Sequence, residues 1–340
     1  MKKIILQPSG KIIECGLEET VLSALEKQGY ALPNNCRAGA CGECKIKVLR
    51  GEFDQGFILD MALSQEDREL GYGLMCMAKP VSDELEIEFA SEDAKPTLFP
   101  PMENSWHIIS DKMQRTDNIL ELKLSPLGKP IKFWPGQYAM LGDEELGYPL
   151  RPYSIANPPA QNGELTFLIT RDPKGKTSKW IHDELAIGQQ IKLNAPYGTF
   201  LGDPSVNTPI LCLAAGSGLA PILSLLNAYL SRGHKNPVTL LFSAKKRADL
   251  IHYGYMKYLE FKFPNFKYTY TLTQEKNPED ENCQGRINEV LPRIMNDLKD
   301  YNIYIAGGVG FVQSCLSVVK ALGAKEELIN MEEYFAQQAM

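Results

Sequence analysis

The stretch Asn35-Cys36-Arg37-Ala38-Gly39-Ala40-Cys41-Gly42-Glu43-Cys44 decides how the first third of this 340-residue chain folds. Its three cysteines follow the spacing C-x4-C-x2-C, and a fourth cysteine, Cys76, follows the last of them with 31 residues in between. Because no secretion signal precedes them, thiols this close together indicate metal ligands rather than disulfides. The small residues Gly39, Ala40 and Gly42 allow the backbone to pass close to a bound group.

The spacing of Cys36, Cys41, Cys44 and Cys76 is the one that plant-type [2Fe–2S] clusters use. Four thiolates must converge on two irons, so three come from one loop and the fourth from a distant segment. A structural zinc site is one alternative, but it usually takes two C-x2-C pairs, and the chain offers only one. Chance burial of cysteines is the other alternative. The remaining cysteines, at positions 15, 212, 283 and 315, are interpreted as packing residues.

Composition and the positions of Gly and Pro residues divide the chain into four parts. Residues 1–92 combine short strands, one helix and the cysteine loop, and residues 93–103 form a linker that contains Lys-Pro and Pro-Pro steps. Residues 104–204 are rich in strands interrupted by Gly and Pro, as in an antiparallel barrel. Residues 205–340 alternate buried strands with helices, which indicates an α/β domain with a parallel sheet.

The periodicity of apolar residues predicts the strands and helices of all three domains. We expect strands at 2–7, 11–15, 45–49, 85–89, 119–124, 165–169, 210–214, 238–243, 267–272 and 302–306. We expect helices from Thr20 to about Gly29, at 179–183, at 219–230, at about 286–296 and at about 311–321.

The net charge of −6 is carried by the N-terminal part of the chain. Residues 1–92 hold 10 Lys and Arg against 16 Asp and Glu, whereas the remainder holds 26 of each. A negative field disfavours nucleic acid as a partner and favours a basic docking surface. The solubility of a small acidic domain is an equally simple explanation. The four histidines (107, 182, 234 and 252) show no ligand-like spacing and are interpreted as ordinary surface or core residues.

Hydropathy predicts neither a membrane span nor an export signal. No apolar run approaches the roughly 20 residues that a spanning helix needs. The apolar part of the N-terminus is too short for a signal peptide. We therefore expect a cytoplasmic protein.

Residues 1–92 resemble a plant-type ferredoxin domain, on the strength of the cysteine loop. A second motif, Arg151-Pro152-Tyr153-Ser154, resembles the R-x-Y-[ST] motif of the ferredoxin–NADP reductase superfamily. That resemblance implies that Tyr153 packs on a flavin, Ser154 hydrogen-bonds near its N5 atom, and Arg151 pairs with the pyrophosphate. From the residues alone, the motif is equally a turn into a strand. The implied cofactor is FAD rather than FMN.

The segment Gly175-Lys176-Thr177-Ser178 precedes the expected helix 179–183. A helix N-terminus with a nearby hydroxyl is a natural anion site. The resemblance implies that Gly175, Lys176, Thr177 and Ser178 hold the flavin pyrophosphate. The alternative is a capping Ser or Thr without a ligand.

The turn Gly216-Ser217-Gly218-Leu219-Ala220-Pro221 follows a buried strand and opens a helix. Gly216 and Gly218 allow close approach of a phosphate, and Pro221 suits the first helical turn. The turn resembles the superfamily's nucleotide loop. Gly307 and Gly308 occupy the place of its Cys-Gly-Pro turn, but Ala306 replaces the cysteine and Gly308 the proline.

Two further features bear on the nicotinamide site. Tyr334 and Phe335 are candidates for the aromatic side chain that covers the flavin face in relatives. The segment 245–250, Lys-Lys-Arg-Ala-Asp-Leu, offers cations for a 2′-phosphate and an acid for the ribose diol, or is simply a solvated face. We favour NADH over NADPH.

The order of the parts resembles the reductase components of bacterial multicomponent oxygenases. That resemblance implies an α+β ferredoxin-like (β-grasp type) domain, an antiparallel β-barrel flavin domain and an α/β nucleotide domain. It also implies an oxidoreductase that passes electrons from NADH through FAD and a [2Fe–2S] cluster to a partner protein such as a terminal oxygenase. Alternatives are a reductase serving a deoxysugar dehydrase, a self-contained flavin reductase, a redox sensor and a zinc-structured adaptor.

Overall fold

The computed structural model describes residues 1–34, 36–89, 97–203, 205–275 and 284–335. It separates into two compact units. The first is Met1–Met102 with Pro196–Thr199, and the second is Glu103–Ala195 with Phe200–Met340. Among the described residues, no helix is both long and apolar enough to cross a membrane.

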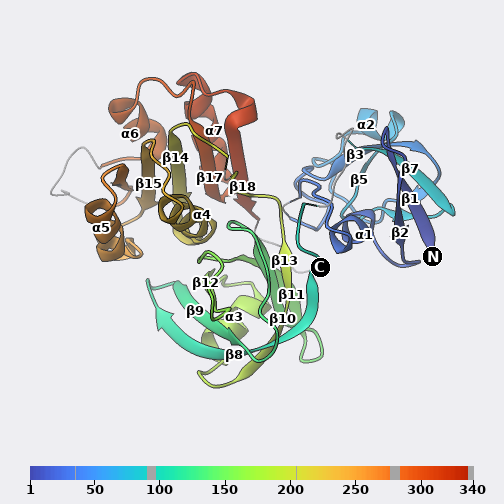
Figure 1. Ribbon diagram of the computed structural model, residues 1–340, viewed down its shortest axis with the longest axis horizontal. Coiled ribbons are helices and arrows are strands. Elements are labelled where there is room, and N and C mark those ends of the chain that lie inside the picture. The colour runs from blue at the N-terminus through green and yellow to red at the C-terminus, as the bar shows by residue number, and fades with distance from the viewer. Residues whose placement is uncertain (35, 90–96, 204, 276–283, 336–340) are drawn as a thin grey trace. The chain divides into compact units, whose positions relative to one another are not determined.

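The N-terminal unit is a five-stranded mixed sheet of order β2-β1-β7-β3-β5, with a helix packed on it (Figure 1). The strands pair antiparallel except for β1 and β7, which run parallel. The helix starts at Thr20, whose side chain accepts a hydrogen bond from Ser23 N and so caps it. The elements are β1 (Lys2–Gln7), β2 (Lys11–Cys15), α1 (Val21–Lys27), β3 (Lys45–Arg50), β4 (Phe53–Asp54), α2 (Gln65–Glu69), β5 (Tyr72–Leu74), β6 (Lys79–Pro80) and β7 (Glu84–Glu88).

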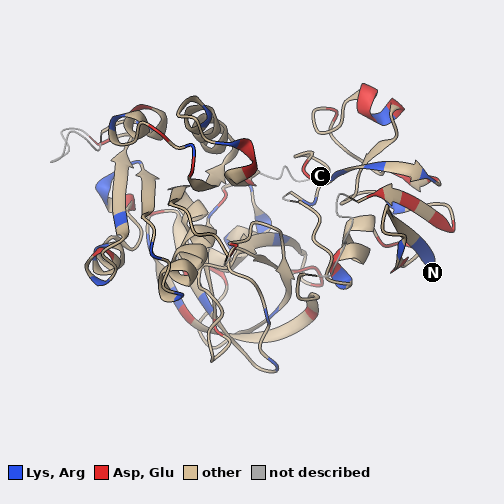
Figure 2. Ribbon diagram, turned by 45° about the horizontal axis from the view of Figure 1, so that its top comes forward, with Lys and Arg blue, Asp and Glu red and all other residues tan. Residues whose placement is uncertain are grey.

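Acidic side chains of this unit lie on α2 and β7 (Figure 2). On β7 the glutamates alternate with the buried Leu85 and Ile87, so one face of the strand enters the core and the other bears charge.

The second unit begins with a six-stranded sheet of order β11-β10-β13-β8-β9-β12, which curves into a barrel (Figure 1). Antiparallel register is explicit for β8 with β9, β9 with β12, and β10 with β11. The elements are β8 (Met102–Gln114), β9 (Ile119–Pro126), β10 (Tyr138–Asp143), β11 (Tyr148–Ser154), β12 (Leu165–Thr170), α3 (Lys176–Asp183) and β13 (Gln190–Tyr197).

The rest of this unit is a parallel sheet of order β16-β15-β14-β17-β18 with helices on both faces. Alternate residues of the central strands enter two cores, one shared with α4 and α5 and the other with α6 and α7. The elements are β14 (Ile210–Ala215), α4 (Leu219–Ser231), β15 (Val238–Ala244), α5 (Tyr253–Lys262), β16 (Phe266–Leu272), α6 (Ile287–Ile294), β17 (Asn302–Gly308), α7 (Val309–Ala321) and β18 (Ile329–Tyr334), with 3-10 turns η1 (Gly216–Gly218), η2 (Arg247–Asp249) and η4 (Glu326–Leu328).

The three-part fold expected from the sequence is confirmed, with differences at particular elements. Helix α3 begins at Lys176, so Lys176, Thr177 and Ser178 lie in its first turn rather than before it. Strand β8 already begins at Met102, inside the expected linker 93–103, of which 93–96 lies outside the described residues. The expected ranges do not include helices α2 and α5 or strands β4, β5, β6, β8, β10, β11, β13 and β18. Residues 151–154 lie within β11 rather than in a turn before a strand. Cys283 also lies outside the described residues.

Candidate functional site

The four cysteines of the predicted cluster site come together as two pairs in the N-terminal unit. Cys36, Cys44 and Cys76 are buried, and Cys41 is half-buried. The thiols of Cys36 and Cys41 are hydrogen-bonded to each other, as are those of Cys44 and Cys76. In each pair one thiol donates to the other, which lowers the pKa of Cys36 to about 5 and also lowers that of Cys76. The thiolate is the form that binds iron.

Backbone N–H groups point at the sulfur atoms. Ala38 N and Ala40 N donate to Cys36 Sγ over 3.4 Å and 3.3 Å. Cys76 N donates to Cys44 Sγ over 3.4 Å. Such bonds stabilise negative charge on sulfur and are one means by which a protein tunes an iron–sulfur cluster.

Two glycines keep the cysteine loop close to a neighbouring loop. Gly39 and Gly42 have φ angles of +65° and +82°, which disfavour any residue with a Cβ atom. A Cβ at Gly39 would lie 2.8 Å from Ile58 Cγ2, and one at Gly42 would lie 2.9 Å from Ala62 O. The loop therefore requires glycine for both conformation and space.

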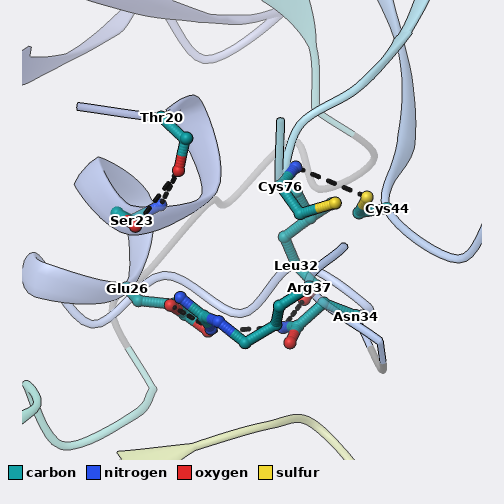
Figure 3. Close-up of polar contacts among 8 residues, drawn as sticks. All are labelled: Thr20, Ser23, Glu26, Leu32, Asn34, Arg37, Cys44 and Cys76. Atoms are coloured by element: carbon teal, nitrogen blue, oxygen red, sulfur yellow. Dashed lines mark hydrogen bonds and ion pairs between the residues drawn. The ribbon is translucent and has the colours of Figure 1, made fainter. Parts of the chain in front are cut away.

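A buried ion pair ties the cysteine loop to helix α1 (Figure 3). Arg37, next to Cys36, has a φ of 51° and places Nη1 2.7 Å from both carboxylate oxygens of Glu26. Glu26 is only 3% exposed, and Asn34 Nδ2 also donates to its Oε1 over 3.3 Å. Since removing one partner of a buried pair strands the other charge, this pair is expected to matter for the loop.

The arrangement fits a binuclear cluster better than a single metal ion. Among the described residues, no group of three or more His, Cys, Asp or Glu side chains surrounds one metal position. Two pairs of thiols suit two irons that each take two protein ligands. The chemistry of the donors, all sulfur, is that of a [2Fe–2S] site.

The predicted flavin residues lie on β11 of the barrel. Ser154 is buried at the end of the strand, and Tyr153 pairs with Ala139 of β10. Burial raises the pKa of Tyr153, so its hydroxyl stays protonated. Arg151 Nη1 donates to Leu150 O over 3.0 Å.

Strand β18 brings two residues to Ser154 that are 178 and 180 positions away in the sequence. Ser154 Oγ donates to Glu332 Oε1 over 3.1 Å, and the Tyr334 hydroxyl lies 3.0 Å from Ser154 Oγ. The second carboxylate oxygen of Glu332 is buried without a hydrogen-bond partner among the described residues. Burial raises the pKa of Glu332 to about 8. A buried carboxyl oxygen with no partner suits a site that receives a polar ligand.

Glu332 was not singled out in the sequence, whereas Tyr334 was considered for the flavin face. Phe335 follows β18 directly and is half-buried. The one sequence signal for Glu332 is its place in a strand beside the aromatic residues, which is too weak to separate it from Glu333.

The N-terminus of α3 lies against β11. Gly175 is the N-cap without a side-chain cap bond, and Thr177 Oγ1 donates to Pro149 O over 2.5 Å. Ser178 Oγ accepts from Asp172 N over 3.1 Å. A Cβ at Gly175 would lie 2.7 Å from Ser178 Oγ, so the turn has room only for glycine. The assignment of Gly175–Ser178 to a pyrophosphate stays a prediction.

The predicted nucleotide turn follows β14 at the carboxyl edge of the parallel sheet, where such sheets bind ligands. Gly216 has a φ of 56°, and a Cβ at Gly218 would lie 2.2 Å from Ala306 O of β17. Pro221 lies in the first turn of α4. The turn therefore packs directly on the strand that ends in Gly307 and Gly308.

Gly308, the last residue of β17, is exposed and is the N-cap of α7. A Cβ at Gly308 would meet nothing within 4 Å, whereas one at Gly307 would lie 2.7 Å from the Phe311 ring. Gly308 thus borders open space, whereas Gly307 is packed against Phe311. Their role toward the nicotinamide stays a prediction.

Three family models match the chain in the order of its domains. Residues 4–81 match a 2Fe-2S iron-sulfur cluster binding domain, and residues 108–201 match an oxidoreductase FAD-binding domain. Residues 212–316 match an oxidoreductase NAD-binding domain.

Relatives of known name extend along nearly the whole chain. The reductase component DmpP of phenol 2-monooxygenase from Pseudomonas sp. (strain CF600) is 33% identical, covering 98% of this chain and 94% of its own. The xylene/toluene monooxygenase electron transfer component XylA of Pseudomonas putida is 30% identical, covering 93% and 89%. Among solved structures, the Amycolatopsis cytochrome P450 reductase GcoB superposes with a TM-score of 0.89 at 25% identity, covering 98% of both chains. The chain therefore belongs to the family of oxygenase reductase components, NAD(P)H-dependent flavoprotein oxidoreductases with a [2Fe–2S] domain.

Proposed function

We propose that this chain takes a hydride from NADH and delivers electrons singly to an oxygenase component. The hydride-transfer part of this proposal rests on the contact of Ser154 with Glu332 and Tyr334. There the last residue of the β11 motif meets strand β18 of the nucleotide domain. When bound, FAD supplies the chemistry that converts a two-electron donor into one-electron deliveries, and the cluster accepts single electrons.

The chain's own residues would bind and orient the cofactors. Tyr153 and Ser154 would line the flavin, with Ser154 near the reacting edge, and the α3 N-terminus would hold its phosphates. Gly216 and Gly218 would admit the dinucleotide phosphates, and the four paired cysteines would hold the cluster. Glu332, protonated below a pKa of about 8, would keep the Ser154 hydroxyl at a fixed position without adding a buried negative charge.

NADH is proposed as the donor because two carboxylates bind the loop after β15. Asp249 Oδ2 accepts from Lys246 N over 3.1 Å, and Glu275 Oε2 accepts from Arg247 N over 2.9 Å. The loop also carries the cations Lys245, Lys246 and Arg247. NADH is therefore favoured because the carboxylates of Asp249 and Glu275 can accept hydrogen bonds from a ribose diol.

The proposed acceptor is an oxygenase, because DmpP and XylA are named as components of monooxygenases. A sugar dehydrase has no such support. A chain that uses NADH and whose described cysteines form no disulfide is expected to work in the cytoplasm.

An anaerobic titration of the purified protein with NADH tests the proposal, followed by visible absorption and electron paramagnetic resonance. We expect the flavin absorption to bleach and a reduced [2Fe–2S] signal to appear. Bleaching without that signal would leave a self-contained flavin reductase. No response of either cofactor would remove the catalytic proposal and favour a sensor.

A further inference from the structure

A carboxylate of the barrel is buried beneath the nucleotide domain. Glu121 lies in β9 between Leu120 and Leu122 and is only 3% exposed. Arg115 donates to both of its oxygens, over 3.1 Å and 2.8 Å, and His252 Nε2 lies 2.7 Å from Oε2. Burial alone would raise the pKa of Glu121, but the hydrogen bonds from His252 and Arg115 outweigh it and lower the pKa to about 2. Glu121 is therefore ionised at neutral pH.

The histidine that reaches this carboxylate has an unusual backbone. His252 is the N-cap of α5 with a φ of 57° and makes no side-chain cap bond. Residues other than glycine rarely adopt this left-handed backbone conformation, and they keep it only where their surroundings hold it in place. Here the side chain points away from its own helix end and toward Glu121 on strand β9 of the barrel. The conformation serves the link to Glu121 rather than the capping of α5.

His252 follows the loop that the proposed function assigns to the adenosine end of NADH. That loop runs from the end of β15 through η2 (Arg247–Asp249). In parallel sheets of this kind the segment after the second strand faces the ribose of the dinucleotide. The link from His252 to Glu121 thus attaches this loop to the barrel.

The same barrel hairpin also touches the other dinucleotide segment. The turn between β8 and β9 ends at Ile119, whose Cδ1 would lie 3.9 Å from a Cβ at Gly216. Nearby, Thr170 Oγ1 donates to Ser217 Oγ over 2.8 Å. The β8–β9 hairpin therefore lies beside the Gly216–Gly218 turn and holds His252 after the β15 loop, while the hydrogen bond to Ser217 comes from β12 of the same barrel.

We propose that Arg115, Glu121 and His252 form a latch that positions the nucleotide domain on the barrel for hydride transfer. The latch fixes both dinucleotide segments against the domain that holds the flavin, so that the nicotinamide meets the flavin at reacting distance. Small displacements at that distance cost much of the rate. This inference rests on the proposed hydride transfer, and it assigns His252 and Glu121 to positioning, not to chemistry.

The variant His252→Asn tests the latch with little backbone strain. Asparagine tolerates the left-handed region but is too short to reach Glu121. In anaerobic stopped flow, we expect the limiting rate of flavin bleaching by NADH to fall about tenfold. The NADH concentration that gives the half-maximal rate should change by less than about threefold. Reduction of the same flavin by dithionite, and the cluster signal that follows, should be unchanged.

Lys257→Gln is the matched control, because it removes an ion pair that stays within α5, from Lys257 Nζ to Glu260 Oε2 at 2.7 Å. It should behave as the unaltered protein. An unaltered limiting rate in His252→Asn would overturn the latch. So would an equal slowing of the dithionite reaction, since that indicates general damage to the flavin site.

Hydrogen exchange supplies a readout that needs no NADH. In His252→Asn, the amides of residues 116–119 and 249–256 should exchange faster together, although they lie in different domains, whereas Lys257→Gln should leave residues 116–119 unchanged. Unchanged protection of 116–119 in His252→Asn would overturn the latch. If the unaltered protein fails to oxidise NADH, the proposed function falls, and this exchange measurement still decides the latch.

Discussion

The cysteine loop and the Ser154–Glu332 junction are built in opposite ways. Three of the four cysteines fall within nine residues, and the N–H···S bonds come from the same loop or from the backbone of Cys76, the fourth cysteine. Ser154 instead meets Glu332 across 178 residues, from a barrel strand to the last strand of a parallel sheet. A local site is specified by a motif, whereas a junction between domains is specified by the fold that brings its parts together.

The largest effect is expected where the local site is broken. Cys44→Ser removes one thiolate, so the reduced [2Fe–2S] signal should disappear. Loss of a residue that supports a metal ligand costs up to roughly 100-fold in activity. Loss of the ligand itself should therefore lower electron delivery to an acceptor protein such as cytochrome c by more than that. Bleaching of the flavin by NADH should remain within about twofold, since the flavin residues lie in the other unit.

Cys15→Ala is the control for that change. Cys15 is buried in the core of the same unit and burial raises the pKa of its thiol to about 11, so it is neither a thiolate nor a ligand in this interpretation. Its variant should keep the cluster signal. Persistence of the signal in Cys44→Ser, or its loss in Cys15→Ala, would contradict the assignment of ligands.

The next effect concerns the support of the loop. Arg37→Gly removes one partner of the buried pair with Glu26, while glycine accepts the φ of 51° without strain. Leaving Glu26 buried without its cation should destabilise the loop by about 3 kcal/mol. The midpoint of cluster bleaching in urea should move to lower concentration.

Arg50→Gln provides a comparison at the surface of the same unit. The Arg50 side chain is 64% exposed and lies 2.7 Å from Glu86 Oε1. Exposed ion pairs contribute little to stability. The shift of the urea midpoint for cluster bleaching should therefore correspond to a loss of no more than about 0.5 kcal/mol in the free energy of unfolding. Equal effects of the two variants would show that burial of the Glu26 pair is not what stabilises the loop.

The junction should respond to pH through Glu332. Its pKa of about 8 means that the carboxyl is neutral at pH 7 and ionises as the pH rises. At the flavin site proposed here, a buried anion would oppose the arrival of a hydride, so the limiting rate of bleaching by NADH should fall about tenfold between pH 7 and pH 9. Glu332→Gln cannot ionise and should lose most of this fall, whereas Glu333→Gln should retain it.

Stability should follow the same titration. Because the folded state raises the pKa of Glu332, its contribution is fully present below the unfolded value of about 4.3 and is lost as the pH rises through about 8. The melting temperature of the unaltered protein should therefore drop between pH 6 and pH 9 by about 5 °C more than that of Glu332→Gln. Parallel pH profiles for the two proteins would contradict the burial of this carboxyl.

These contrasts explain what the sequence could and could not predict. The alternation of strands and helices and the cysteine spacing were enough for the three domains, because each is a pattern of residue types along the chain that needs no knowledge of tertiary contacts. Helix α5 was missed because its sequence, Tyr-Gly-Tyr-Met-Lys-Tyr-Leu-Glu-Phe-Lys, is aromatic on several sides and begins at His252 without a cap signal. Strand β18 was missed because two adjacent glutamates hide its alternation, although Glu332 is buried.

Burial by another domain is the information that a sequence lacks. Glu121 sits in the strand Ile119–Pro126, where alternation places it opposite Leu120 and Leu122 and predicts a solvent-facing residue. The nucleotide domain covers that face, and His252 pairs with Glu121 there. The interpretation of His252 as an ordinary surface or core residue therefore missed a link between domains.

The smallest effect is expected at the exposed loop after β15, where the choice of nucleotide would be made. Glu275→Gln removes one of two carboxylates bound to that loop, so the ratio of kcat/KM for NADH over NADPH should fall about threefold. The change is small because Asp249 remains and solvent screens the site. At about 1 M salt, where the Debye length is about 3 Å, the difference between the variant and the unaltered protein should vanish. A shift that survives high salt would mean that Glu275 acts by shaping the loop through Arg247 N, and the preference for NADH would then rest on Asp249 alone.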